Sequence, residues 1–216
     1  MYCELLSVKK RRWSWPVNKE FIKFKRNITK AECYSLLKDN HYLSKIQKGF
    51  KSGINFGIFY KDKIIGVCIF TGFPVPELSK GCYGLERNDQ EGLYELSRLV
   101  LCPFAQSNCH NLASWFISKC LKIMKKEIKA RAILSYADTN FHNGIVYAAS
   151  NFKYYGLSVA KKDFFYLQDG NYIKHSRGKT KGVLGKWMAR SQKHRFLITF
   201  DKKLSCKWVE EKWCNL

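Results

Sequence analysis

Residues 135–156 read SYADTNFHNGIVYAASNFKYYG, and this stretch decides the fold. It predicts the end of a strand, a polar loop, one short helix and a second strand. Alternation along the first strand places Ser135 on one face and Asp138 on the other, so Asp138 falls at the strand's C-terminal end. Ligands bind at that end of the strands in open α/β sheets. The stretch therefore predicts a site that begins at Asp138.

The helix of this stretch is predicted from its apolar spacing. Asn143 and Gly144 form a helix-start signal. The apolar side chains that then recur at helical spacing are Ile145, Ala148, Ala149 and Phe152. This spacing leaves Tyr147 on the opposite, free face, next to the strand-end Asp138. Such an arrangement is typical of an active-site wall, and it is equally compatible with a tightly packed connection between a helix and a strand.

Outward from this stretch, periodicity and turn signals predict the remaining elements. A capping box at Thr29 and Glu32 opens a helix that runs to about Asp39. The other predicted elements are a hairpin of Ile54–Tyr60 and Lys63–Thr71, a strand Leu93–Leu101, a helix Leu112–Glu127, and strands Ala130–Ala137, Lys153–Val159 and 192–200. The loop from Gly72 to Gly92 is long enough to be functional or mobile. This order predicts one α/β domain, with a central mixed, twisted sheet and helices on both faces.

The charge of the chain predicts a polyanionic partner. Its formal net charge is +22, from 39 Lys and Arg against 17 Asp and Glu. Each phosphate that a Lys or Arg neutralises releases a condensed counterion, which favours binding of such a chain to a polyanion. We divide the chain into a basic N-terminal arm (1–28), a core (29–160) and a basic C-terminal segment (161–216) that completes the sheet. Both a monomer and a homodimer are compatible with the sequence.

Basic clusters near both ends supply the candidate nucleic-acid contacts. Near the N-terminus, Trp13 lies among basic residues, where it either stacks on a base or packs onto the core. The candidates are Arg11, Arg12, Trp13, Arg177, Lys179, Lys181, Lys193, His194 and Arg195. The alternative for such basic runs is a solvated face without a partner.

The sequence carries no pattern of a membrane or disulfide-bonded protein. No apolar run approaches the ~20 residues of a membrane span, and no secretory apolar region follows the basic N-terminus, so we expect no membrane partner. The nine cysteines include no C-x-x-C pair, and their odd number does not support a disulfide framework. Free thiols in the cytoplasm fit this pattern, and we expect no metal site.

Arg98 is the sharpest single candidate for chemistry. By alternation it shares a strand face with Tyr94, Leu96 and Val100. An unpaired charge on such a face is costly, so Arg98 needs an anion. The anion is either Asp138, in a purely structural pair, or a phosphate or carboxylate of a substrate. Tyr147 is a candidate proton donor or substrate-orienting hydroxyl.

Six segments together resemble the Mom-like DNA modification proteins of bacteriophages. They are NHY (40–42), NFGIFYKDKIIGVCIF (55–70), YELSRLVL (94–101), NLASWFISKCLK (111–122), SYADTNFHNGIVYAASNFKYYG (135–156) and KHRFLITF (193–200). The resemblance covers most of residues 30–200. Its strongest anchors are Arg98, the motif Ser135-Tyr-Ala-Asp138, and the motif His142-Asn-Gly144-x-x-Tyr147.

This resemblance implies a GNAT-like acyltransferase fold for the core, and double-stranded DNA as the partner of the basic segments. The implied activity converts adenine N6 in phage DNA to a carbamoylmethyl form, which shields the DNA from host restriction enzymes. The implied location is the host cytoplasm, if the chain is encoded by a phage. The implied site residues are Arg98, Asp138 and Tyr147, with His41, Tyr42 and Ser135 as further pocket candidates.

The donor of the transferred group stays open. GNAT enzymes hold the coenzyme A pyrophosphate in a Q/R-x-x-G-x-G/A loop, whereas the corresponding segment here, 106–111, has no glycine. Acetyl-CoA, or another acyl or aminoacyl donor, would meet this segment at Gln106, Ser107, Asn108 and Asn111. Two other functions stay open: an N-acetyltransferase acting on a protein or RNA amine, and a non-catalytic DNA-binding protein on a degenerate GNAT scaffold.

Overall fold

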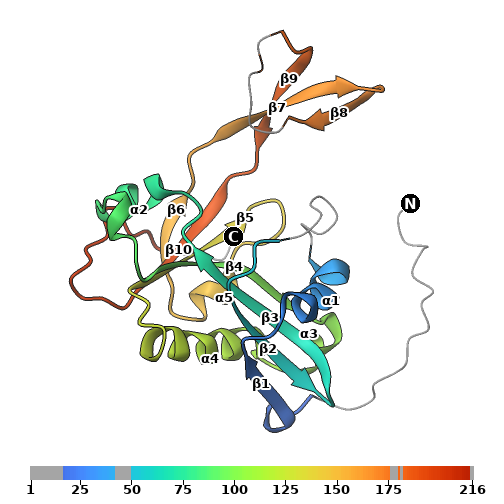
Figure 1. Cartoon of the computed structure of the whole chain (residues 1–216), viewed down its shortest axis with the longest axis vertical. Helices are drawn as coiled ribbons and strands as arrows, with labels where there is room; N and C mark the ends of the chain where they lie inside the picture. The colour runs from blue at the N-terminus through green and yellow to red at the C-terminus, as the bar shows by residue number, and fades with distance from the viewer. Residues whose placement is uncertain (1–16, 42–49, 176–179, 181, 215–216) are drawn as a thin grey trace.

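The computed structural model describes residues 17–41, 50–175, 180 and 182–214. A seven-stranded sheet forms its centre, in the order β1-β2-β3-β4-β5-β10-β6 (Figure 1). The strands are β1 (Ile22–Arg26), β2 (Ile54–Tyr60), β3 (Lys63–Gly72), β4 (Leu93–Leu101), β5 (Ala132–Asp138), β6 (Lys153–Leu157) and β10 (Lys193–Thr199). The neighbours β4 and β5 run parallel, and the other pairs in this sheet run antiparallel. The sheet is therefore mixed, as predicted.

Helices cover both faces of the sheet, which confirms the predicted fold class. They are α1 (Lys30–Asn40), α2 (Pro76–Tyr83), α3 (Pro103–Asn108), α4 (Leu112–Lys126) and α5 (Ile145–Ala148), with short 3-10 turns at Lys19–Phe21 and Arg87–Asp89. On one face α3, α4 and α5 contribute to a large core that includes Phe116. On the other face α1 and α2 cover two smaller, separate cores, which contain Leu37 and Tyr83 respectively.

Most of the predicted elements begin and end close to their expected positions. The capping box of α1 is present, because the Glu32 N–H donates to the Thr29 hydroxyl at 3.1 Å and the Thr29 N–H donates to the Glu32 carboxylate at 2.7 Å. The sequence analysis missed β1, which lies within the expected N-terminal arm but pairs with β2. Lysines alternate with apolar residues in β1. This pattern is typical of an edge strand, but in the sequence alone it is hard to distinguish from a basic arm.

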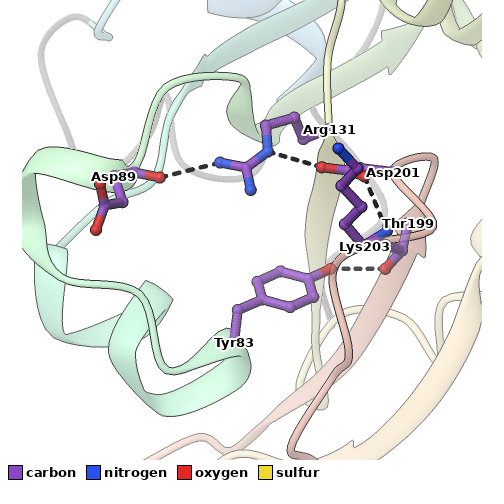
Figure 2. Close-up of polar contacts among 6 residues, drawn as sticks. All are labelled: Tyr83, Asp89, Arg131, Thr199, Asp201 and Lys203. Atoms are coloured by element: carbon purple, nitrogen blue, oxygen red, sulfur yellow. Dashed lines mark hydrogen bonds and ion pairs between the residues drawn. The ribbon is translucent and has the colours of Figure 1, made fainter.

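The prediction of a loop over residues 72–92 is wrong, because this segment contains α2 and a 3-10 turn. Figure 2 shows how the segment is fastened to the sheet. The hydroxyls of Tyr83 and Thr199 are 2.6 Å apart. The Arg131 side chain donates to a carbonyl of the 3-10 turn at 3.1 Å and to the Asp201 carboxylate at 3.0 Å. Two helix signals in this segment were not used in the prediction: Pro76 in the first turn of α2 and Gly84 directly after its last turn.

β4 and β5 pair over only part of their length, and this opens the sheet. Their parallel ladder ends at the pair Leu96–Ser135, although both strands continue. Directly after Leu96, Ser97 is an extra residue that has no partner in the register between β3 and β4. Such a bulge bends a strand and increases its twist. The C-terminal parts of β4 and β5 therefore diverge within the sheet.

A second, three-stranded sheet projects from the core between β6 and β10 (Figure 1). Its strands are β7 (Lys161–Gln168), β8 (Asn171–Lys174) and β9 (Gly185–Arg190), in the order β8-β7-β9. The sequence analysis predicted no strands here. Asp169 and Gly170, which join β7 to β8 with positive φ angles, are a strong hairpin signal that it did not use.

Gly144, directly before α5, is expected not to tolerate a side chain. Its φ is +82°, and a Cβ there would collide with the Phe196 ring and lie 3.0 Å from the Cβ of Ala137. Gly170 is the matched control, because its φ is +75° and no atom lies within 4 Å of such a Cβ. We expect Gly144→Ala to lower the free energy of unfolding by about 3 kcal/mol and Gly170→Ala by about 1 kcal/mol. Equal losses in urea unfolding would contradict the expected collision.

Candidate active site

A cavity of about 200 Å³ lies where β4 and β5 diverge. Its walls come from the end of α1, the second part of β4, α3, β5, α5 and the loop that precedes α5. The lining residues with polar side chains are Asn40, His41, Ser97, Arg98, Gln106, Tyr136, His142 and Tyr147. Four of them were predicted as site residues from separate parts of the sequence: His41, Arg98, Gln106 and Tyr147. The fold therefore brings these four together.

Arg98 lies on a different face of the sheet from the one predicted. Alternation put Leu96, Arg98 and Val100 on one face, but the extra residue Ser97 reverses the alternation after Leu96. Leu96 packs in the core beneath α4, whereas Val100 packs against α1. Arg98 faces Ile69, which also belongs to the α1 side, so Arg98 lies on that side of the sheet.

Asp138, one of the two anions expected to pair with Arg98, is not its partner. Nη1 of Arg98 donates to the Ser97 carbonyl at 2.6 Å. Among the described residues, no carboxylate lies within 4.0 Å of the Arg98 guanidinium. A partly buried guanidinium that lines a cavity without a carboxylate partner is chemically suited to bind an anion.

His41 ends α1 and lines the same cavity. Burial lowers the pKa of its imidazole to about 4, and the nearby Arg98 and His142 act in the same direction. His41 is therefore neutral at pH 7 and contributes an uncharged ring to the cavity. Tyr42, predicted beside it, lies outside the described residues.

Tyr147 lines the cavity from the packed side of α5, which corrects the prediction of a free face. Its side chain is 5% exposed and its ring centroid lies 5.8 Å from Phe152 and 5.4 Å from Phe196. Ile145, predicted to be packed, is 52% exposed. The helix has a single turn, so the contacts of its flanking segments decide which side is buried, and helical spacing does not.

Ser135 and Asp138 are not among the described residues that line the cavity. Ser135 is fully buried, and its hydroxyl donates to the Leu96 carbonyl at 3.1 Å, which joins β4 to β5 at their last pair. The Asp138 carboxylate accepts from the Ser191 hydroxyl at 2.9 Å and from the Asn140 N–H at 3.1 Å. Both residues therefore position the strands that border the cavity.

The sequence analysis missed Glu95. On the face of the sheet that α1 and α2 cover, polar side chains form a strip. The strand register places Glu95 of β4, Tyr136 of β5 and Lys193 of β10 on this face, which is also the face of Arg98. Burial raises the pKa of Glu95, and the positive charges of Lys193 and Arg98 partly oppose that shift. Burial also lowers the pKa of Lys193. A carboxylate inside the otherwise apolar strand YELSRLVL was the signal that could have found Glu95.

Residues 23–207, which include the whole of this site, match the Mom protein family. The chain belongs to this family. No curated protein matches it significantly.

Solved structures similar to this Mom family member are acetyltransferases. A GNAT-family acetyltransferase from Streptococcus pneumoniae has 11% identity and a TM-score of 0.50, over 83% of this chain and 99% of that chain. An N-acetyltransferase from Staphylococcus aureus has 12% identity and a TM-score of 0.50, over 82% and 98%. An acetyltransferase from Bacillus subtilis in complex with CoA has 11% identity and a TM-score of 0.48, over 83% and 99%. The two similarities with a TM-score of 0.50 establish the fold alone, which is GNAT-like as predicted.

The segment predicted to hold the donor does not form one loop in this family member. Gln106, Ser107 and Asn108 end α3, and Asn111 precedes α4 in a left-handed conformation with φ 54°. Gln106 lines the cavity described above, whereas Asn111 lines another cavity beside α4. Without a glycine in this segment, a side chain stands at every position where a backbone would approach a pyrophosphate. These residues therefore do not fit the pyrophosphate of coenzyme A.

The predicted DNA contacts fall into two groups. Those outside the described residues are Arg11, Arg12, Trp13, Arg177, Lys179 and Lys181. Lys193, His194 and Arg195 lie in β10, within the strand predicted over 192–200, and they are half-buried inside the sheet. Nδ1 of His194 and the Tyr154 hydroxyl are 2.9 Å apart, and Arg195 stacks over the Trp208 ring at 4.5 Å. Their side chains contact the protein itself.

Membrane spans, metal sites and cysteines are assessed for the described part of the chain alone. None of its helices is long and apolar enough to cross a membrane. It contains no group of three or more His, Cys, Asp or Glu side chains placed to hold a metal ion. Its cysteines are free thiols, as predicted.

His41 is expected to make the protein sensitive to acid. Its pKa is about 4 in the folded state against 6.5 for the unperturbed side chain, so the unfolded state binds more protons between these values and stability falls as the pH drops through them. From pH 7 to pH 4, we expect the free energy of unfolding to fall more in the wild type than in His41→Asn. The difference between the two decreases is on the order of 2 kcal/mol, after discounting for the partial exposure of the ring. The exposed His110 supplies the control, His110→Asn. An identical pH dependence for wild type and His41→Asn would contradict this.

Proposed function

We propose that the protein is a DNA-modifying transferase, which converts adenine N6 to a carbamoylmethyl-type adduct and so protects the DNA from restriction enzymes. The observation that carries the proposal is the cavity at the β4–β5 opening, where Arg98 lies with His41 and Tyr147 in a member of the Mom family. The formal charge of +22 supports a polyanionic substrate. If the chain is encoded by a phage, it acts in the host cytoplasm.

The target adenine reaches the cavity by leaving the duplex. Enzymes that do chemistry on a base flip the nucleotide out of the stack, and they hold it by stacking and by hydrogen bonds to its edge. The lining of the cavity suits this task. Tyr136 and Tyr147 supply aromatic rings, and the amides of Asn40 and Gln106 supply both donors and acceptors.

We propose Glu95 as general base; it lies on the polar strip beside Arg98 and is not among the described residues that line the cavity, so it would act through one water molecule. The N6 amine is conjugated with the adenine ring and is a weak nucleophile, so loss of its proton during attack lowers the barrier. A carboxylate with a raised pKa is a stronger base than an ordinary one, and Arg98 provides the positive charge for an anionic group of the donor. In the transfer, the amine nitrogen bonds to the methylene carbon of a donor that already carries the carboxamide, Glu95 takes the proton, and the leaving group on that methylene departs with the bonding electrons.

Acetyl-CoA, or another acyl or aminoacyl donor attacked at its carbonyl carbon, would leave an N6-acyl adenine. A carbamoylmethyl product therefore requires a donor that carries its leaving group on a methylene next to a carboxamide. The absence of glycine from 106–111 argues against a pyrophosphate held at the start of α4. A donor whose own anionic group binds Arg98 is therefore favoured over one held by its nucleotide.

Arg98→Lys is expected to abolish most of the modification. Lysine keeps the charge but lacks the planar fork that binds a carboxylate or phosphate with two hydrogen bonds. We expect the modified adenine in plasmid DNA from expressing cells to fall about 100-fold, as measured by mass spectrometry of nucleosides. Arg87→Lys, at an exposed position outside any ion pair of the described residues, is the control and should leave the level unchanged.

The same measurement separates the alternative functions. An unmodified adenine pool with the wild-type protein would overturn the proposal and leave an acetyltransferase of protein or RNA amines. If folded Arg98→Lys and Glu95→Gln variants still protected DNA from restriction digestion, a non-catalytic DNA-binding role would replace it.

Glu95 sets the expected pH dependence of the reaction. A base must be deprotonated, and burial raises the pKa of Glu95 above the usual 4.5, so the rate should rise with pH through that raised value. Glu95→Gln should remove this rise and lower the rate about 100-fold, whereas the exposed Glu91→Gln should do neither. Initial rates on plasmid DNA across the acidic range measure this. If the rate of the Glu95→Gln variant still rises with pH across the acidic range, Glu95 is not the base.

A further inference from the structure

The sheet β8-β7-β9 projects from the core (Figure 1), and we call its described residues, 161–175 and 182–190, the arm. Phe164 is the one buried residue of the arm as described. Trp187 is 59% exposed and Leu167 is 43% exposed. A sheet this small is marginal in water unless a face packs against something. The arm therefore offers two faces to a partner.

One face of the arm carries a row of positive charges. The register sets Lys161 directly opposite Arg190, and it puts Lys186 and Lys174 on the same face on either side of β7. Asp163, also on this face, lies 2.6 Å from the Lys174 ammonium. For the other three cations, no carboxylate of the described residues lies within 4.0 Å. Like charges directly opposite one another destabilise a sheet, so an anion outside the chain would relieve this repulsion.

Aromatic rings lie among these cations. The ammonium of Lys186 is 3.8 Å from the centroid of the Tyr172 ring, and Tyr172 is 46% exposed. Phe165 lies between Lys174 and Lys186 in the register. Cations interleaved with flat rings suit a nucleic acid, because the cations neutralise phosphates while the rings contact sugars and bases.

The root of the arm lies at the candidate active site. After β9 the chain enters β10 through Ser191, whose hydroxyl donates to the Asp138 carboxylate at 2.9 Å. The hydroxyl of Thr139 donates to the Gln192 carbonyl, also at 2.9 Å. Asp138 ends β5, and β5 borders the cavity through Tyr136. A ligand that binds along the arm is therefore held beside the cavity.

We propose that the arm is a DNA-binding element that enters the major groove of a duplex, with its cationic face toward the phosphates. All three strands overlap only at Phe165 and Tyr166, so most of the arm is a two-stranded ribbon. Two strands about 4.8 Å apart fit a groove about 12 Å wide, and other proteins bind DNA with such β-ribbons. The major groove of duplex RNA is too narrow for side chains to enter. The choice of DNA as the polyanion rests on the proposed function, whereas the cationic face does not.

The test compares two double variants that change the charge equally. Lys161→Glu with Lys186→Glu alters the arm, and its first change places a carboxylate opposite Arg190, which favours the fold of the arm. Lys119→Glu with Lys126→Glu alters exposed positions of α4, on the side of the core away from the arm (Figure 1). Fluorescence anisotropy measures the affinity of each for a labelled DNA duplex of about 20 base pairs at several salt concentrations.

We expect the arm variant to bind at least about tenfold more weakly than the α4 variant, with a salt slope lower by about 2 for two lost phosphate contacts. Equal affinities would overturn the proposal. Tighter binding of duplex RNA than of duplex DNA by the wild type, lost in the arm variant, would also overturn it, because the arm would then be an RNA-binding element. Far-UV circular dichroism and urea unfolding check that the variants fold. If the Glu variants do not fold, Lys→Gln changes at the same four positions give the same comparison.

This experiment is independent of catalysis. If the wild type leaves adenine unmodified while the arm variant loses DNA affinity, the proposed function fails and the arm proposal stands. If adenine is modified and the arm variant binds DNA as well as the α4 variant, the arm proposal fails and the proposed function stands.

Discussion

The early end of the ladder between β4 and β5 is the constraint on which the site depends. After the pair Leu96–Ser135 the two strands stop sharing hydrogen bonds, and Ser97 is inserted into β4 at that point. The Ser135 hydroxyl bonds the Leu96 carbonyl and holds the strands together directly before they diverge. A continuous sheet would fill this space with backbone pairs. The divergence instead leaves a cavity whose walls are side chains from five elements.

The same insertion decides the electrostatics of the cavity. It moves Arg98 to the α1 side of the sheet, away from the core beneath α4, where a guanidinium would have no partner. On its own side Arg98 shares a polar strip with Glu95 and Lys193, and His41 stays neutral next to it. The strip therefore combines a fixed positive charge with groups whose ionisation is shifted, which is typical of a catalytic site.

The Asp138 carboxylate links a strand that borders the cavity to the root of the arm. Asp138 ends a strand that borders the cavity, and it accepts a hydrogen bond from Ser191 at the root of the arm. A substrate held along the arm and a base flipped into the cavity would then be two parts of one complex. This arrangement explains why Asp138, a catalytic candidate from the sequence, has a positioning role in the fold.

The sequence by itself determined the α/β class, the capped helix α1, the hairpin, and the gathering of polar residues after β5, because these depend on local periodicity and turn chemistry. Only the tertiary structure decided which residues share the cavity. One inserted residue, Ser97, reverses the strand alternation that placed Arg98, and a helix of a single turn, α5, has no period from which the burial of Tyr147 could be predicted. Glu95 shares a polar strip with Lys193 only because β10 pairs with β5 and brings Lys193 from a distant part of the chain. Strand order and register are non-local, so a pattern read along the chain does not contain them.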